Sequence, residues 1–176
     1  MWRGRRLMAP AGVETRPTGV RARQAVFDIL LHAPWAGGAW LRGVRVLDVF
    51  AGTGAYGLEA LSRGAAGAAF LENSGPALAA LRANIAACRA EDVARVVARD
   101  VLAAGPGAPH GLVFLDPPYG QGLVTRAVAV LGAHGWVAPG AVMVAELGPG
   151  DEFAVREVLA ERRHGKARLI FWRFAP

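Results

Sequence analysis

The sequence contains a single cysteine, Cys88, which excludes an internal disulfide framework and any metal site built from several cysteines. Its longest apolar runs, such as residues 65–71, are far shorter than the ~18–20 residues of a membrane-spanning helix. No apolar stretch of roughly 7–15 residues follows the basic residues 1–6, so we expect no signal peptide and a cytoplasmic location. With 176 residues, of which 53% are hydrophobic and 19% charged, the chain is expected to fold as one domain.

Positive charge is concentrated at the two ends of the chain. Residues 1–25 hold six arginines and one acid, and residues 162–176 hold five cations and no acid, whereas residues 26–161 hold nine arginines and thirteen acids. Basic ends on a mildly acidic body predict binding to a polyanion such as nucleic acid, although a solvated arginine-rich surface is the alternative interpretation. The candidate RNA-binding residues are Arg3, Arg5, Arg6, Arg16, Arg21 and Arg23.

Strand and helix patterns alternate along the chain. Runs of branched residues predict strands at 44–50, 68–72, 93–98, 112–115 and 141–146, and helical spacing predicts helices at 18–31, 58–63, about 74–88 and 123–131. Two further strands, at about 155–162 and 167–174, are close enough to pair as a hairpin. We therefore expect an α/β fold, a doubly wound and mostly parallel seven-stranded sheet with an antiparallel edge hairpin and a small basic N-terminal extension.

The first motif, Asp48-x-x-x-Gly52-x-Gly54-x-x-Gly57, follows the first predicted strand. Glycines allow a sharp turn and a close approach to a ligand, and this spacing is typical of a dinucleotide site, with Glu72 placed to hold ribose hydroxyls with both carboxylate oxygens. An NAD-linked oxidoreductase is therefore one interpretation, and a simple glycine turn is another. Asp48 argues against a pyrophosphate and favours a cationic ligand such as S-adenosylmethionine, which carries a sulfonium and an ammonium group but no phosphate.

The second motif, Asp116-Pro117-Pro118-Tyr119, follows the fourth predicted strand. Two prolines remove two N–H donors, so that a carboxylate and carbonyl oxygens remain as acceptors. An exocyclic aromatic amine, N6 of adenine or N2 of guanine, is a poor nucleophile because its lone pair is delocalised. Hydrogen bonds from the amine to Asp116 and to the Pro117 carbonyl would free that lone pair, the carboxylate would stabilise the developing positive charge, and Tyr119 could stack on the base. Alone, the motif is also compatible with a proline turn that carries a surface tyrosine.

Residues 48–54, 57–65 and 116–119, together with Trp2-Arg3-Gly4-Arg5-Arg6-Leu7 and the Thr15-Arg16-Pro17-Thr18 segment near the start, resemble the bacterial 16S ribosomal RNA guanine-N2 methyltransferases. The resemblance implies a class I S-adenosylmethionine-dependent fold of the Rossmann-like type. Residues 1–31 would be a basic arm and helix of the same domain, and residues 32–176 the methyltransferase domain. It also implies methylation of guanine 966 in 16S ribosomal RNA on an assembling 30S particle, by a monomer that needs no metal.

The resemblance also implies residue roles. By position, Asp48, Phe50, Gly52 and Gly54 would wrap the methionine part of the cofactor, Glu72 would hold the ribose, and Asn73, Asp100 and Val101 would lie at the adenine. The catalytic residues would be Asp116, Pro117, Pro118 and Tyr119, which present the guanine amine. Glu146, at the end of a predicted strand, is either a rim residue of the site or a cap. Three alternatives stay open: an adenine-N6 methyltransferase on DNA or RNA, an NAD-linked oxidoreductase, and a catalytically silent RNA-binding assembly factor.

Overall fold

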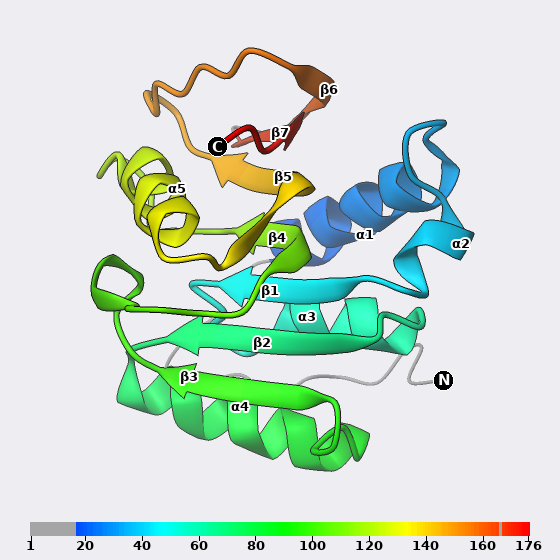
Figure 1. Cartoon of the computed structure of the whole chain (residues 1–176), viewed down its shortest axis with the longest axis vertical. Coiled ribbons are helices and arrows are strands. Elements are labelled where there is room, and N and C mark those ends of the chain that lie inside the picture. The colour runs from blue at the N-terminus through cyan, green and yellow to red at the C-terminus, as the bar shows by residue number, and fades with distance from the viewer. Residues whose placement is uncertain (1–16, 166) are drawn as a thin grey trace.

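The computed structural model describes residues 17–165 and 167–176, and a seven-stranded sheet forms its centre (Figure 1). The strand order is β3-β2-β1-β4-β5-β7-β6. The parallel strands are β1 (Arg45–Val49), β2 (Gly67–Glu72), β3 (Ala94–Ala98), β4 (His110–Leu115) and β5 (Val137–Leu147). Strands β6 (Val158–His164) and β7 (Ala167–Arg173) form the antiparallel edge, with β7 next to β5. The expected mixed sheet with an edge hairpin is confirmed.

Helices cover both faces of the sheet. The first face carries α1 (Pro17–His32), α3 (Ala55–Ser62) and α4 (Gly75–Cys88), and the opposite face carries α5 (Leu123–Ala133) and the short 3-10 helix η1 (Val101–Ala103) (Figure 1). A one-turn helix, α2 (Gly38–Leu41), follows α1. Each face of the sheet has its own hydrophobic core, and because side chains alternate along a strand, the central strands contribute to both. Phe70 and Phe114 lie in the core under α1, α3 and α4, and Leu47 and Val113 lie in the core under α5 and η1. None of the helices within the described ranges is both long enough and apolar enough to span a membrane.

Several element boundaries differ from the sequence prediction, and two of these differences lie at the start of α3 and of β5. Helix α3 begins at Ala55, three residues before the predicted start, because Gly54 takes a left-handed conformation and serves as its N-cap. Strand β5 begins at Val137, four residues before the predicted start, since a register shift in β4 lets His110 pair with Val137. Helix α3 and strand β5 are therefore longer than predicted, and the order of the strands in the sheet is unchanged.

The chain order creates a switch point between β1 and β4. From β1 the chain winds outward to β2 and β3, and from β4 it winds the other way to β5. Open α/β sheets bind their ligands at the carboxyl ends of the strands on either side of such a switch. In Figure 1 the carboxyl ends of β1, β2 and β3 all point to the left edge of the molecule. The glycine motif follows β1 and the Asp116 motif follows β4, so the topology brings the two motifs to one crevice.

Candidate functional site

The loop between β1 and α3 combines strained backbone with open space. Phe50 has a φ of 60°, Gly52 of 53° and Gly54 of 79°. A left-handed conformation at a non-glycine residue costs of order 1–3 kcal/mol, so Phe50 holds this shape only because its surroundings impose it. A Cβ atom at Gly54 would collide with Leu81, whereas one at Gly52 would meet nothing closer than 4.0 Å. The loop is therefore packed against the core at Gly54 and open to a ligand at Gly52.

Asp48 lies beneath this loop and is only 2% exposed. Its Oδ2 atom accepts a hydrogen bond of 2.8 Å from the backbone N–H of Gly57, which ties β1 to the first turn of α3. Burial raises the pKa of Asp48 to about 8; the Gly57 hydrogen bond opposes this rise, and the neighbouring carboxylates of Asp116 and Glu72 add to it. The carboxyl group therefore holds a proton at pH 7 unless a cation lies beside it.

Glu72 ends β2 and organises the backbone around it. Its Oε2 atom accepts from the N–H of Gly52 at 2.8 Å, and its Oε1 atom accepts from the N–H groups of Asn73 at 2.9 Å and Ser74 at 2.8 Å. A carboxylate has about four acceptor positions, so about one stays open to a ribose hydroxyl. The sequence predicts that both carboxylate oxygens of Glu72 hold ribose hydroxyls. Three backbone N–H groups already donate to these oxygens, so Glu72 has room for about one hydroxyl.

Asn73, Asp100 and Val101 meet at the ends of β2 and β3, as the sequence predicts. The Asn73 side-chain amide donates to Asp100 Oδ2 at 3.4 Å, and Asp100 Oδ1 accepts from the N–H of Leu102 at 2.8 Å, which caps η1. Val101 is 4% exposed and so presents little surface to a ligand. Asp100 and Asn73 are the members of this group with polar atoms at the surface.

The Asp116 motif leaves β4 beside the end of β1. The N–H of Asp116 approaches the carbonyl oxygen of Val49 at 3.5 Å, and the Asp116 side chain is exposed at the crevice. Pro117 is buried and Pro118 is exposed, so the first proline anchors the loop. Tyr119 is 37% exposed, and its ring lies so close to Gly148 that a Cβ atom there would collide with it. The loop after β5 therefore forms one wall against the Tyr119 ring.

Glu146, predicted as either a rim residue or a cap, and Tyr56, to which the sequence assigned no role, join this site. Glu146 is the second-last residue of β5 and follows Ala145, which pairs with Leu115 immediately before Asp116. Its Oε1 accepts from the Tyr119 hydroxyl at 2.7 Å, and its Oε2 accepts from the Tyr56 hydroxyl at 3.5 Å. Burial, followed by the charges of Asp116, Glu146 and Asp48, raises the pKa of Tyr56 far above its ordinary value. The charges of three carboxyl groups therefore act on the Tyr56 hydroxyl, and Glu146, which contacts it directly, is a rim residue of the site.

Asp151 connects the two loops that flank Tyr119. One of its carboxylate oxygens accepts from the N–H of Gly120 at 2.9 Å, and the other accepts from the N–H of Gly148 at 2.8 Å. The sequence shows Asp151 only as an acid after a glycine-rich turn, with no signal of its partner 31 residues away. Asp151 fixes the spacing between the Asp116 loop and the loop after β5.

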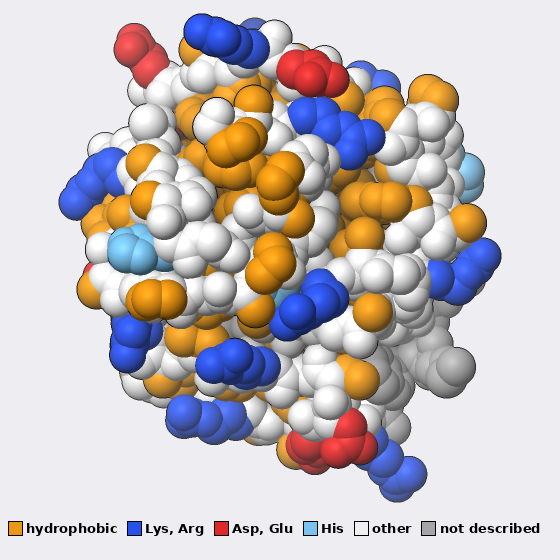
Figure 2. Space-filling view, in the orientation of Figure 1, with side chains coloured by type: hydrophobic (Ala, Val, Ile, Leu, Met, Phe, Trp, Pro, Cys, Tyr) orange, Lys and Arg blue, Asp and Glu red, His pale blue; other side chains and the backbone are white. Residues whose placement is uncertain are grey.

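The arginines predicted to bind RNA fall into two groups. Four of them, Arg3, Arg5, Arg6 and Arg16, lie outside the described residues. Of the two on α1, Arg21 is exposed, whereas Arg23 is half-buried and its charge opposes the rise in the pKa of both Asp48 and Tyr56. Arg23 thus lies within electrostatic reach of the crevice. Figure 2 shows cationic side chains spread over the viewed face rather than gathered in one patch.

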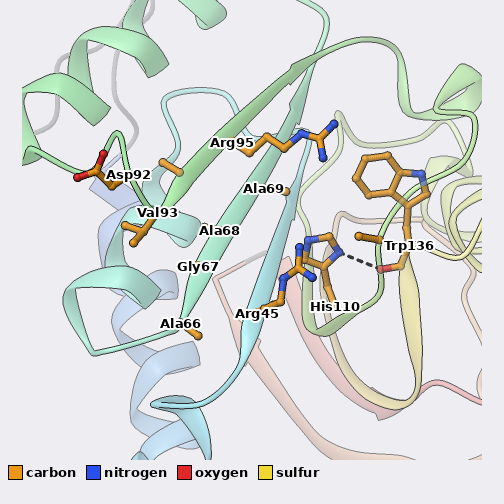
Figure 3. Close-up of a pocket in the computed structure, with 12 residues that line it drawn as sticks. Arg45, Ala66, Gly67, Ala68, Ala69, Asp92, Val93, Arg95, His110 and Trp136 are labelled. Carbon is orange, nitrogen blue, oxygen red and sulfur yellow. Dashed lines mark hydrogen bonds between the residues drawn. The ribbon is translucent and has the colours of Figure 1, made fainter.

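A separate depression of about 230 Å³ lies at the opposite, amino-terminal end of the strands (Figure 3). Arg45 of β1 and Arg95 of β3 lie on either side of Gly67 and Ala69 of β2. The depression forms there because these two residues have small side chains or none. Burial lowers the pKa of His110 in its wall, and the charges of both arginines add to this lowering. None of the residues that the sequence predicts for the site lines this depression.

The chemistry of the crevice fits a cationic ligand without phosphate. Five carboxyl groups stand at the ends of the strands, from Asp48, Glu72, Asp100, Asp116 and Glu146. Residues 51–54, which form the open loop, include no cationic side chain. A pyrophosphate would face carboxylates here, whereas a ligand with a sulfonium, an ammonium group and ribose hydroxyls would find acceptors.

Comparison with known proteins gives consistent matches along the chain. The family described as "Conserved hypothetical protein 95" matches residues 1–173. The chain is 40% identical over 151 residues to Ribosomal RNA small subunit methyltransferase D of Escherichia coli strain K12, which covers 82% of this chain and 70% of that protein. It is 33% identical over 151 residues to the Haemophilus influenzae protein of the same name, with 83% and 75% covered. The solved structure of the Escherichia coli protein yhhF matches with a TM-score of 0.83 and 34% identity, over 98% of this chain and 93% of that one.

Proposed function

The chain belongs to the conserved hypothetical protein 95 family, the family of the ribosomal RNA small subunit methyltransferases D, and on this basis we propose that it methylates N2 of a guanine in 16S ribosomal RNA. The observation that carries the proposal is the meeting of the glycine loop and the Asp116 loop at the switch point between β1 and β4. The sequence resemblance supports guanine 966 as the target and an assembling 30S particle as the substrate.

S-Adenosylmethionine is the proposed cofactor, and it would supply an electrophilic methyl group on a sulfonium. The open backbone at Gly52 and the remaining acceptor position of Glu72 are the groups that would hold its methionine and ribose parts. Asp100 and Asn73 would lie at the adenine, next to the end of β3. The buried Asp48 would lose its proton when an ammonium group approaches the loop, because a nearby cation favours the charged form.

Asp116 is the proposed catalytic residue for the guanine amine. It is exposed at the crevice and accepts one N2–H, while the Pro117 carbonyl accepts the other. Both hydrogen bonds concentrate electron density on nitrogen, and the carboxylate stabilises the positive charge that grows there. Transfer of the methyl group to N2 would break the bond between that carbon and the cofactor's sulfur, which keeps the electron pair, and the Asp116 carboxylate would accept the proton that N2 loses. No covalent intermediate with the protein is required.

Tyr119 is the proposed base-stacking residue. Its hydroxyl is held by Glu146 and its ring rests against Gly148, so the orientation of the ring is fixed before RNA arrives. A fixed ring restricts the angle at which the base can present its amine. The arginine-rich ends of the chain would bind the RNA backbone, while the acidic crevice would take the base and the cofactor.

Calorimetry and a methyl-transfer assay test this function together. S-Adenosylmethionine should bind the purified protein and NAD should not, and labelled methyl groups should pass to 16S ribosomal RNA in unmodified 30S particles. Binding of NAD alone would overturn the proposal in favour of an oxidoreductase. Cofactor binding without transfer to any RNA would overturn it in favour of a silent assembly factor.

A further inference from the structure

We propose that Glu146 accepts the N1–H of the target base and thereby makes the site select guanine over adenine. The inference rests on the proposed function, and it assigns the choice of base to a residue outside both sequence motifs. The Asp116 motif alone does not make this choice, since two acceptors for an exocyclic amine suit N6 of adenine as well as N2 of guanine.

The position of Glu146 follows from strand pairing. Strands β4 and β5 are parallel neighbours with Leu115 paired to Ala145, so the next residue of each chain segment, Asp116 just after β4 and Glu146 within β5, lies at the same edge of the sheet. Glu146 also holds the Tyr119 hydroxyl at 2.7 Å, which places its carboxylate at the ring proposed to stack on the base. A base whose amine meets Asp116 therefore turns the next atom of its edge toward Glu146.

That next atom distinguishes the two purines. The carbon that carries the guanine amine is bonded to N1–H, a hydrogen-bond donor, on one side and to N3 on the other, whereas the carbon that carries the adenine amine is bonded to an N1 with a lone pair. An ionised carboxylate can only accept hydrogen bonds, so it pairs with N1 of guanine and repels N1 of adenine. Sites that require a hydrogen bond from the substrate reject an analogue that lacks it far more strongly than apolar pockets reject a size mismatch.

The carboxylate has the capacity for this contact. Tyr119 donates to Oε1 and Tyr56 donates to Oε2, which uses about two of the four acceptor positions. Both tyrosines hold Glu146 by hydroxyl groups, so the protein supplies donors and leaves the remaining acceptor positions to the substrate. Tyr56 is in turn fixed by stacking on Phe114, with ring centroids 4.9 Å apart. The acceptor is therefore oriented by two elements, α3 and the Asp116 loop.

A base analogue combined with a Glu146 variant tests the N1 contact. 2-Aminopurine keeps the N2 amine of guanine, but it lacks O6, and its N1 carries a lone pair and no hydrogen. We would place guanine or 2-aminopurine at the target position of 16S ribosomal RNA ligated from segments, reconstitute 30S particles, and measure methyl transfer under single-turnover conditions. Wild-type protein should prefer guanine by about 10²-fold or more. Glu146→Gln offers both an acceptor and a donor, so the preference should fall at least tenfold while transfer to 2-aminopurine rises.

Two further variants keep the test specific. Glu91→Gln changes an exposed glutamate just before β3, at the opposite end of the sheet, and should leave both rates and their ratio unchanged. Tyr119→Phe removes the hydroxyl that Glu146 holds, and it should change both rates by the same factor. An unaltered preference in Glu146→Gln, or the same response from Tyr119→Phe, would overturn the inference and leave a purely structural role. A wild-type protein that fails to methylate guanine would instead overturn the proposed function.

Discussion

At the scale of single residues, burial changes the chemistry of Asp48 most clearly. Its pKa is raised from 3.8 to about 8, chiefly because the folded protein removes the carboxyl group from water. Between these two values the folded protein holds a proton that the unfolded chain has lost. The resulting contribution to stability is fully present below pH 4 and disappears as the pH rises through about 8.

Replacement of Asp48 by asparagine should remove this pH dependence. The asparagine side chain keeps an oxygen that can accept from the N–H of Gly57, but it does not titrate. Between pH 5 and 7 the free energy of unfolding of the wild type should fall relative to that of Asp48→Asn by about 1 kcal/mol per pH unit. Urea denaturation at a series of pH values measures both curves. Parallel curves would show that Asp48 is ionised in the folded protein.

Substitutions of Asp116 and of Tyr119 should affect methyl transfer in different ways. In the proposed mechanism Asp116 accepts from the amine and meets charge only in the transition state, so Asp116→Ala should lower the single-turnover rate by about 10²-fold or more. Tyr119→Phe keeps the ring and should stay active, whereas Tyr119→Ala should lose stacking worth ~1–3 kcal/mol. Equal losses from Phe and Ala would assign the role to the hydroxyl and not to the ring. Full activity in a folded Asp116→Ala protein would remove Asp116 from the chemistry.

At the scale of elements, the junction between β1 and α3 depends on glycine at one position. Gly54 has a φ of 79°, and a Cβ atom there would collide with Leu81 and lie 3.2 Å from the Phe70 ring. Gly43 provides the matched control, because it is exposed, its φ is not in the left-handed region, and nothing lies within 4 Å of an added Cβ atom. The contrast between the two sites separates conformational strain and overpacking from the general effect of a Gly→Ala change.

Gly54→Ala should lower the free energy of unfolding by about 2 kcal/mol or more, through strain at a positive φ and overpacking against Leu81. Gly43→Ala should change it by no more than about 0.5 kcal/mol in the unfavourable direction. Chemical denaturation of both variants measures the difference. Equal stabilities would mean that the loop relaxes without cost.

Elements and motifs were predictable where they depend on local pattern. Alternating branched residues and helical spacing identify every strand of the sheet, and the glycine and Asp116 motifs identify the ends of β1 and β4. The contacts among Tyr56, Tyr119 and Glu146 were not predictable, since these residues are up to 90 positions apart and meet only when β4 pairs with β5 and Tyr56 of α3 stacks on Phe114. The three backbone amides that occupy Glu72 were missed because acceptor capacity is not visible in a sequence.

At the scale of the whole molecule, charge is segregated between site and surface. The chain carries a net charge of +6, yet five carboxyl groups gather at the ends of its parallel strands. Under the proposed function, a basic exterior would attract an RNA backbone, and an acidic crevice would accept a cationic cofactor and a base that donates hydrogen bonds. RNA affinity and cofactor affinity should therefore depend on different residues.

Replacement of Arg3, Arg5 and Arg6 together by glutamine should test this separation. RNA binding should weaken, and the slope of its salt dependence should decrease by roughly one for each phosphate that the protein no longer neutralises. Affinity for S-adenosylmethionine should stay the same. A matched triple change of the exposed Arg82, Arg89 and Arg126, on or next to α4 and α5, should leave the slope near the wild-type value. An unchanged slope in the first variant would make these three arginines an ordinary solvated surface.

The most direct test of the central claim is the identity of the methylated nucleoside. Unmodified 30S particles would be incubated with the protein and S-adenosylmethionine carrying a deuterated methyl group, and the 16S ribosomal RNA would be digested and analysed by mass spectrometry. The account predicts deuterated N2-methylguanosine at one position of the RNA, absent when the protein carries Asp116→Ala. Deuterated N6-methyladenosine, or no labelled nucleoside, would contradict it.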